Sequence, residues 1–267
     1  ELLSTTIDTS EVSRINHRSP DETAVTVSQE TAELIRKGLE YGERTEGAFD
    51  ITIQPVSSLW DFTSGQAKLP DPEILKEAAQ KVDYRNVHVE GSQVILDSPD
   101  TAIDLGAIAK GYIADRIKDY LLENGVNSAT INLGGNVLCV GSRPDGTPFK
   151  IGLQMPFADR NETIAALNID GLSVVTSGVY ERHFELDGVN YHHLLNPEDG
   201  YPYQNGLLSV TIVSPLSVDG DALSTSCFSL GLEKGMELAE SMDGVYAYFI
   251  TDDYEIHYSE GARELIS

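Results

Sequence analysis

The 267-residue sequence predicts an α+β protein in which mixed or antiparallel sheets are flanked by helices. Two observations favour this class. Amphipathic helical stretches alternate with short strand patterns along the whole chain, and several neighbouring strands are joined by turns short enough for hairpins. No long linker interrupts the pattern. We therefore expect a single domain over residues 1–267, in which any two lobes would share one core.

Helices are predicted where apolar residues recur at helical spacing behind a start signal. The first runs over Ser28–Tyr41, and the second starts at Asp71 with Pro72 in its first turn. A third is expected over about Ala107–Glu123. Another follows Asp221, whose carboxylate is expected to cap it.

Strands are predicted where β-branched and aromatic residues lie between turn residues. They are expected over residues 87–89, 94–96, 130–133, 137–140, 150–154, 163–169, 174–176, 184–186, 189–195, 208–213, 246–250 and 256–258. The first two should form a hairpin, and the five between residues 150 and 195 should form a meander.

The composition is that of a globular protein with a strongly acidic surface. Hydrophobic residues make up 40% and charged residues 23%, with 18 basic and 43 acidic residues giving a formal charge of -25. Nucleic acid and anionic lipid would be repelled, so neither is an expected partner. No apolar run approaches the ~20 residues that cross a bilayer, so no transmembrane segment is expected. The first residue is Glu1, and we expect a processed chain from which a signal peptide or lipid anchor could have been removed.

The segment Asp221-Ala-Leu-Ser-Thr225 places a carboxylate and a hydroxyl four residues apart. Residues so spaced stack on one helix face, with ~5–6 Å between their Cβ atoms. Such a pair can share one Mg²⁺ ion, which takes one or two protein carboxylates and completes its shell with phosphate and water. A plain helix cap is the alternative for Asp221, and the two roles are compatible because helix N-termini favour anions.

A second segment, Asp104-Leu-Gly-Ala-Ile-Ala-Lys-Gly-Tyr112, also places a carboxylate ahead of a helix. Gly106 permits a sharp turn or a close ligand approach, and Lys110 would project from the first helical turn towards a phosphate. A capped helix with a solvated lysine is the alternative. Together the two segments predict a site for a phosphorylated cofactor that uses a divalent cation.

Three further features allow a functional and a structural interpretation. The glycine turn at Gly134 and Gly135 offers backbone amides, or is a simple strand reversal. Trp60 would stack on an aromatic ring of a ligand, or pack in the core. His193, near the turn at Pro197, would act on the phosphates, or serve only the fold.

Seven motifs in this order resemble the ApbE family of FAD:protein FMN transferases. They are Ser13-Arg-Ile-Asn16, Gly47–Trp60, Asp104–Tyr112, Asn132–Gly135, Thr176-Ser-Gly178, Tyr191–Pro197 and Asp221–Thr225. The resemblance runs from about Ser10 to Gly261. It implies an α+β fold with an FAD site in a cleft, and an Mg²⁺-dependent transfer of FMN from FAD to a threonine or serine of an acceptor protein, releasing AMP.

Other functions stay open beside this one. An Mg²⁺-dependent FAD pyrophosphatase would use water in place of the acceptor hydroxyl, and a non-catalytic flavin-binding module would use neither. The resemblance also implies an extracytoplasmic location, exported or lipid-anchored in bacteria, and a cytoplasmic location stays open.

The resemblance assigns roles to individual residues. The expected metal ligands are the Asp221 and Thr225 side chains, with Ser224 beside them, and the backbone carbonyl of Ala107. The expected cofactor contacts are Asp104, Lys110, Leu59, Trp60, Asp61, Leu195, Gly134, Gly135, Ser177 and Gly178. Asp221, as the anchor of the metal, and His193, as general base, are the expected catalytic residues.

Three departures from the family pattern bear on these roles. Asp61 stands where glycine is common, and Asn196 replaces a frequent aspartate. Both changes bear on contacts with the cofactor. Glu198-Asp-Gly200 replaces Arg-Thr-Gly in a turn, where we expect less effect.

Overall fold

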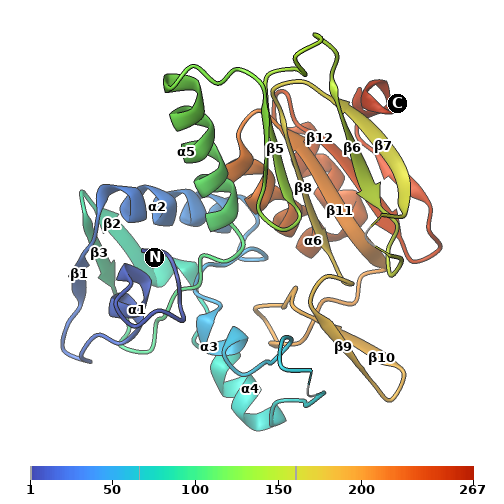
Figure 1. Ribbon diagram of the computed structural model, residues 1–267. Helices are drawn as coiled ribbons and strands as arrows, with labels where there is room; N and C mark the ends of the chain where they lie inside the picture. Colours follow the sequence, from blue (N-terminus) through green and yellow to red (C-terminus); the bar gives the residue numbers. More distant parts are fainter. Residues whose placement is uncertain (1, 66, 160) are drawn as a thin grey trace. The chain divides into compact units, whose positions relative to one another are not determined.

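Figure 1 shows the computed structural model of the chain, which describes residues 2–65, 67–159 and 161–267. These residues form two compact units. Unit 1 comprises the residues up to Ala109 together with Arg182–Tyr203, and unit 2 comprises Lys110–Glu181 and Gln204–Ser267. Helices and antiparallel sheets occur in both, which confirms the predicted α+β class. No helix in the described ranges is long and apolar enough to cross a membrane.

The helices of unit 1 begin where the sequence carries start signals. They are α1 (Glu11–Asn16), α2 (Gln29–Arg44), α3 (Gln54–Ser57), α4 (Pro72–Ala79) and the 3-10 helix η1 (Tyr84–Asn86). Ser28 caps α2 by accepting the Thr31 N–H, and Asp71 caps α4 by accepting the Glu73 N–H. Both predicted starts are confirmed. The short helices α1 and α3 were not predicted, because six and four residues carry too little periodicity.

The strands of unit 1 form a three-stranded sheet and a separate hairpin. The sheet has the order β1 (Ala24–Thr26), β3 (Gln93–Leu96), β2 (Val87–Glu90), with antiparallel pairing throughout. The predicted hairpin of β2 and β3 is confirmed. The second hairpin pairs β9 (His183–Leu186) with β10 (Val189–His192).

His192, the last residue of β10, is buried and serves this hairpin. Its Nε2 lies 3.1 Å from the Tyr203 carbonyl oxygen, and its Nδ1 accepts the Leu194 N–H. Burial lowers the pKa of His192 to about 4, so the ring is neutral at pH 7.

Unit 2 is built on a six-stranded antiparallel sheet. Its order is β13 (Ile256–Tyr258), β12 (Tyr246–Thr251), β11 (Leu207–Ser214), β8 (Ser173–Gly178), β5 (Asn136–Val140) and β4 (Ala129–Asn132). Outside it, β6 (Phe149–Gln154) pairs with β7 (Thr163–Ile169). The 3-10 helix η2 (Ala262–Leu265) follows β13.

The predicted meander over residues 150–195 is wrong, although each strand within it exists. β6 and β7 form one hairpin, β9 and β10 another, and β8 lies between β5 and β11 in the large sheet. The last of these strands was expected to end at Leu195, but it ends at His192. Leu195 makes only an isolated bridge to Pro202. Local patterns specify the strands and these two hairpins, whereas the partners of β8 depend on packing across distant parts of the chain.

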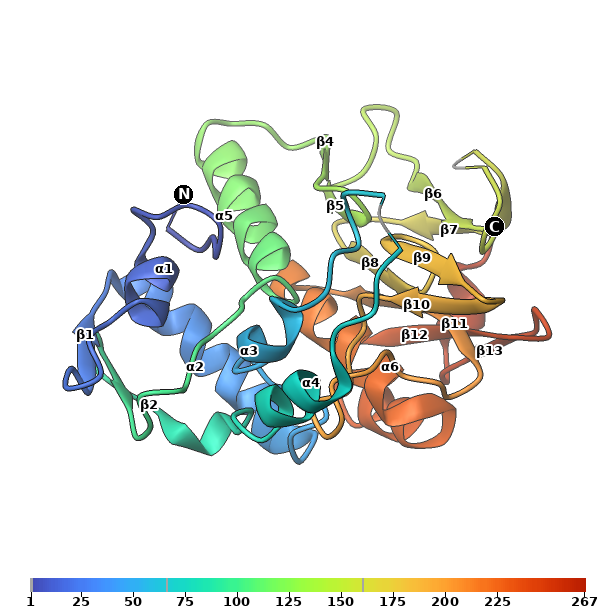
Figure 2. The same cartoon turned by 90° about the horizontal axis from the view of Figure 1, so that it is seen from below.

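The large sheet is covered on both faces. Val174 of β8 packs in a cluster with Leu153 and Leu167 of the β6–β7 hairpin. Its neighbour Val175 faces the other way, where a Cβ at Gly220 of the helix α6 (Ser217–Glu240) would lie 3.0 Å from it. Successive side chains of a strand point to opposite faces, so β8 contributes to both layers. Figure 2 shows α6 lying along this sheet.

The helix α5 (Ala109–Glu123) starts later than expected, and α6 starts earlier than expected. α5 begins two residues after Ala107, because a turn at Leu105 precedes it. α6 begins at Ser217, which makes Leu216 its N-cap residue. The prediction that Asp221 caps this helix is therefore wrong. Asp221 lies in the second turn of α6.

Each of these two helices is capped by an aspartate of the other. Asp115 of α5 accepts the N–H groups of Ser217 and Val218 at 2.8 and 2.9 Å. Asp221 of α6 accepts the N–H of Gly111 at 2.8 Å. The first amides of a helix have no partner within it, so each carboxylate satisfies donors that would otherwise be unpaired. The missing side chain of Gly111 permits this contact, since a Cβ there would lie 2.2 Å from the Ser217 carbonyl oxygen.

Gly111→Ala is expected to destabilise the protein, although alanine is the better helix former. At an open helical position this change stabilises by about 1 kcal/mol. At Gly111 the added methyl group meets backbone that cannot rotate away, so we expect a loss of about 2 kcal/mol or more. Denaturant unfolding measures the difference. Gly125→Ala is the control, because its φ of +80° adds backbone strain of about 1 kcal/mol while its Cβ would meet no atom within 4 Å. A more stable Gly111→Ala protein would contradict the packing described.

His192 should make the stability fall as the pH falls. Between the ordinary value of 6.5 and the lowered pKa of about 4, the unfolded chain binds a proton that the folded chain does not bind. From pH 7 to pH 5 this linkage amounts to about 2 kcal/mol. Urea unfolding at both pH values should therefore show a steeper loss for the wild type than for His192→Gln. Equal losses in the two proteins would refute this linkage.

Candidate functional site

Asp221 is a buried carboxylate with a cation close to it. Its side chain is 5% exposed, and Lys110 Nζ lies 3.8 Å from its Oδ1. Burial raises the pKa of Asp221, against the opposing effects of Lys110 and of the Gly111 N–H. A raised pKa means that the ionised carboxylate is incompletely compensated, so a further cation beside it would be favourable.

Three hydroxyl groups lie together near the same turn of α6. Ser177 Oγ, from β8, lies 2.9 Å from Ser224 Oγ and 3.3 Å from Thr225 Oγ1. Ser224 also donates to the Asp221 backbone carbonyl at 3.0 Å. Within unit 2, the structure thus brings Asp221 next to Lys110, and Ser177 next to Ser224 and Thr225.

The predicted glycine turn lies next to β8. Gly134 and Gly135 have φ values of 64° and 91°, a conformation that side chains with a Cβ rarely adopt. The Gly135 carbonyl accepts the N–H of Thr176, the residue before Ser177. The Gly134 N–H donates to the side chain of Asn132, which fixes the turn.

Gly178 has a packing role at the end of β8. A Cβ at this position would lie 2.8 Å from the ring of Tyr180. Without it, the Tyr180 ring packs across the strand end.

In unit 1, Asp104 is held by a small hydrogen-bond network. It accepts the Gly106 N–H at 2.8 Å and the Ser57 hydroxyl at 3.1 Å. The preceding residue, Ile103, pairs through both its N–H and its C=O with the side chain of Asn16. This pairing gives the Ser13-Arg-Ile-Asn16 motif a structural role that the sequence alone did not reveal. Ala107 lies in the turn before α5 and is half-buried.

Trp60 lies in an aromatic cluster of unit 1. Its ring stacks on Phe62 with 5.4 Å between centroids and on Tyr191 with 5.9 Å, while its indole N–H donates to the Gly200 carbonyl. These contacts match the core-packing alternative for Trp60. Leu59 and Leu195 pack against the same cluster.

Two of the departures from the family pattern have local partners. Asp61 is exposed and accepts the N–H groups of Thr63 and Ser64, and hydrogen bonds led by those of Ser64 lower its pKa to about 2. Asn196 accepts the Glu198 N–H. Each side chain therefore shapes its own loop.

His193 follows β10 and is held through one ring nitrogen. Its Nδ1 lies 3.3 Å from the Arg182 carbonyl oxygen. Because a carbonyl only accepts, Nδ1 carries the proton, and in the neutral ring the lone pair is on Nε2. This tautomer suits the role of a base acting through Nε2.

The sequence interpretation missed Gly111 and Asp115 as residues that position the site. A glycine inside a predicted helix is a signal of close backbone approach. Asp115 carried no comparable signal, because an aspartate within a polar helix is usually solvated. In the part of the chain that the structure describes, no group of three or more His, Cys, Asp or Glu side chains is placed to hold a metal ion.

Comparison with known proteins agrees with the motifs. The sequence profile of the ApbE family matches residues 1–249. The FAD:protein FMN transferase of Klebsiella pneumoniae strain 342 is 40% identical over 265 residues, which cover 98% of this chain and 82% of that protein. A protein of the same name from Treponema pallidum is 35% identical, with 97% and 76% covered.

Solved structures are similar over the full length of the chain. The ApbE protein of Thermotoga maritima superposes with a TM-score of 0.90 at 34% identity, covering 100% of this chain and 86% of that one. The flavin transferase ApbE from Vibrio cholerae gives a TM-score of 0.87 at 29% identity, covering 99% and 85%. The family profile, the relatives and the fold together confirm the resemblance, and the chain belongs to the ApbE family.

Proposed function

We propose that the chain is an enzyme that transfers FMN from FAD to a hydroxyl group of an acceptor protein. The observation that carries the proposal is the buried Asp221 carboxylate, one helical turn from Thr225 and 3.8 Å from Lys110. It occurs in a chain that resembles FAD:protein FMN transferases along its length. We propose threonine or serine as the acceptor residue.

The donor atoms near Asp221 suit Mg²⁺. They are a carboxylate and the hydroxyl groups of Thr225, Ser224 and Ser177, all of them hard oxygen ligands. Asp221 and Thr225 would hold the ion, with Ser224 beside them. The Ala107 carbonyl is a further proposed ligand on the resemblance alone. When bound, Mg²⁺ would draw negative charge from the phosphate oxygens and make the FMN-side phosphorus more electrophilic.

Lys110 would bind the phosphates, which the acidic chain as a whole repels. It projects from the first turn of α5, where the helix N-terminus adds partial positive charge. Unit 2, which includes Lys110, also includes four other residues predicted to contact the cofactor: Gly134, Gly135, Ser177 and Gly178. Unit 1 includes the remaining predicted contact residues, which are Leu59, Trp60, Asp61, Asp104 and Leu195.

The transfer exchanges one phosphorus–oxygen bond for another. The acceptor hydroxyl oxygen forms an ester bond with the FMN-side phosphorus, while the anhydride bond breaks and its electron pair leaves with AMP. The hydroxyl proton passes to a base. His193 is the proposed base, because its Nδ1–H faces the Arg182 carbonyl and leaves the lone pair on Nε2.

The activity is tested with FAD, Mg²⁺ and a candidate acceptor protein. In-gel flavin fluorescence, the added mass of FMN on the acceptor and release of AMP would together support the proposal. FMN and AMP released to water, with no labelled acceptor, would identify a pyrophosphatase instead. Bound flavin without AMP release would identify a flavin-binding module.

We also propose an extracytoplasmic location, on the resemblance alone. Cell fractionation of the native host, with an antibody against this chain, tests it. Recovery in the cytoplasmic fraction would contradict it.

Asp221→Asn is expected to abolish FMN transfer together with stabilisation by Mg²⁺. The amide oxygen can still accept the Gly111 N–H, but the charge that holds the ion is gone. Increasing MgCl₂ should raise the midpoint temperature of thermal unfolding for the wild type and leave it unchanged for the variant. Asp219→Asn is the control, with the same loss of charge on the same helix. A variant that keeps the Mg²⁺ response would show that the metal assignment is wrong.

His193→Ala is expected to slow transfer by roughly 10²–10⁴-fold, the usual contribution of a general base. Binding of Mg²⁺, followed by thermal unfolding, should not change. His183→Ala, at an exposed histidine of β9, serves as the control. Single-turnover rates with an acceptor protein measure the effect. Equal rates for His193→Ala and the wild type would exclude the proposed role.

A further inference from the structure

We propose that Asp115 is a positioning residue of the Asp221 site, because its carboxylate anchors the first turn of the helix that carries Asp221 and Thr225. This inference rests on the proposed function. Asp115 itself would touch neither metal nor substrate.

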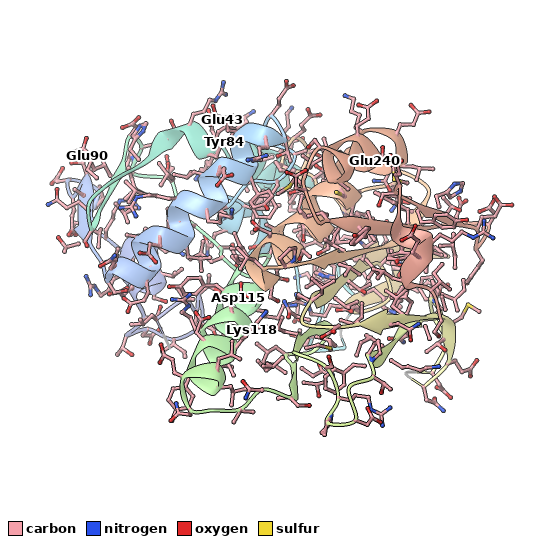
Figure 3. All side chains as sticks on the ribbon, turned by 90° about the horizontal axis from the view of Figure 1, so that it is seen from above. Glu43, Tyr84, Glu90, Asp115, Lys118 and Glu240 are labelled. Atoms are coloured by element: carbon pink, nitrogen blue, oxygen red, sulfur yellow. The ribbon has the colours of Figure 1, made fainter. Side chains whose placement is uncertain are left out.

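The anchor consists of two short hydrogen bonds to consecutive amides. Oδ1 of Asp115 accepts the Ser217 N–H at 2.8 Å, and Oδ2 accepts the Val218 N–H at 2.9 Å. The side chain is buried, with 7% of the residue exposed. Figure 3 labels Asp115 and Lys118 on α5, with Asp115 where α5 meets α6. A carboxylate held at both oxygens permits little sliding or rotation of α6 at its start.

The spacing along both helices transmits this constraint to the site. Gly111 and Asp115 are four residues apart on α5, and Ser217 and Asp221 are four apart on α6. Gly111 donates its N–H to Asp221, and Ser217 donates its N–H to Asp115. Thr225 lies a further four residues along the same face of α6. Displacement of Ser217 would therefore displace Asp221 and Thr225 with it.

Other contacts keep the helix folded when Asp115 is replaced. Ser217 Oγ donates to Asn136 Oδ1 at 2.8 Å and lies 2.8 Å from Ser173 Oγ, which ties the start of α6 to β5 and β8. Replacement of Asp115 should thus loosen the helix start rather than detach it. The expected defect is in metal affinity more than in folding.

The test compares Asp115→Ala, Asp115→Asn and the wild type by Mg²⁺ titration. The rise of the unfolding midpoint with Mg²⁺ concentration gives an apparent dissociation constant for Mg²⁺, and the Mg²⁺ dependence of FMN transfer at saturating FAD gives a second one. Asp115→Ala should raise both roughly tenfold, the shift expected for loss of a supporting partner of a metal ligand. Asp115→Asn keeps one acceptor and should restore part of the affinity.

Leu167→Ala separates positioning from general destabilisation. Leu167 is a fully buried core residue of β7 in the same unit, outside the Asp221 site. This variant should lower the unfolding midpoint and leave both apparent dissociation constants for Mg²⁺ unchanged. Equal Mg²⁺ affinities for Asp115→Ala and the wild type would overturn the positioning role of Asp115 but not the proposed function. Equal shifts in Mg²⁺ affinity for Asp115→Ala and Leu167→Ala would have the same meaning. A wild type with neither Mg²⁺-dependent stabilisation nor transfer would overturn the proposed function as well.

Discussion

The reciprocal capping of α5 and α6 is the interaction on which the proposed site in unit 2 depends. Two carboxylates satisfy the first amides of two helices, and each carboxylate comes from the helix that it does not cap. Asp221 is therefore a structural cap as well as the charged group of the proposed site. A helix N-terminus stabilises a nearby anion, so the fold itself supports a carboxylate in a buried position.

Local charge explains how so acidic a chain would accept a dinucleotide. The formal charge of -25 repels phosphates at long range. Within the site, Lys110 and the N-terminus of α5 supply positive potential, and a bound divalent cation would add to it. Burial raises the pKa of Asp221, because one lysine at 3.8 Å does not fully balance the buried carboxylate. Removal of water strengthens each of these interactions.

The sequence predicted the parts of the fold that local chemistry determines. Ser28 and Asp71 start helices as expected, and the β2–β3 hairpin follows from its turn. The strand partners of β8 were not predictable, since its pairing with β5 and β11 depends on packing between distant segments.

The candidate site was predictable as residue types, and its geometry was not. Asp221 was expected to cap its own helix, because an aspartate before an apolar run usually does so. In the structure, Asp115 of α5 caps this helix. Asp221 instead accepts the N–H of Gly111, which is 110 residues away in the sequence. Contacts over such separations leave no local pattern. The hydroxyl cluster of Ser177, Ser224 and Thr225 has the same character, since β8 supplies one member and α6 the other two.

The interleaved order of the two units bears on how the chain folds as it is synthesised. Unit 1 lacks its β9–β10 hairpin until Tyr203 has been made, by which point the first half of unit 2 has already been synthesised. That half holds β8 without β11, its antiparallel neighbour in the centre of the large sheet. At ~5–20 residues per second, the nascent chain would carry β8 with β5 on one side and an open edge on the other for several seconds. Until β11 is made, this open edge is a template for pairing with another chain.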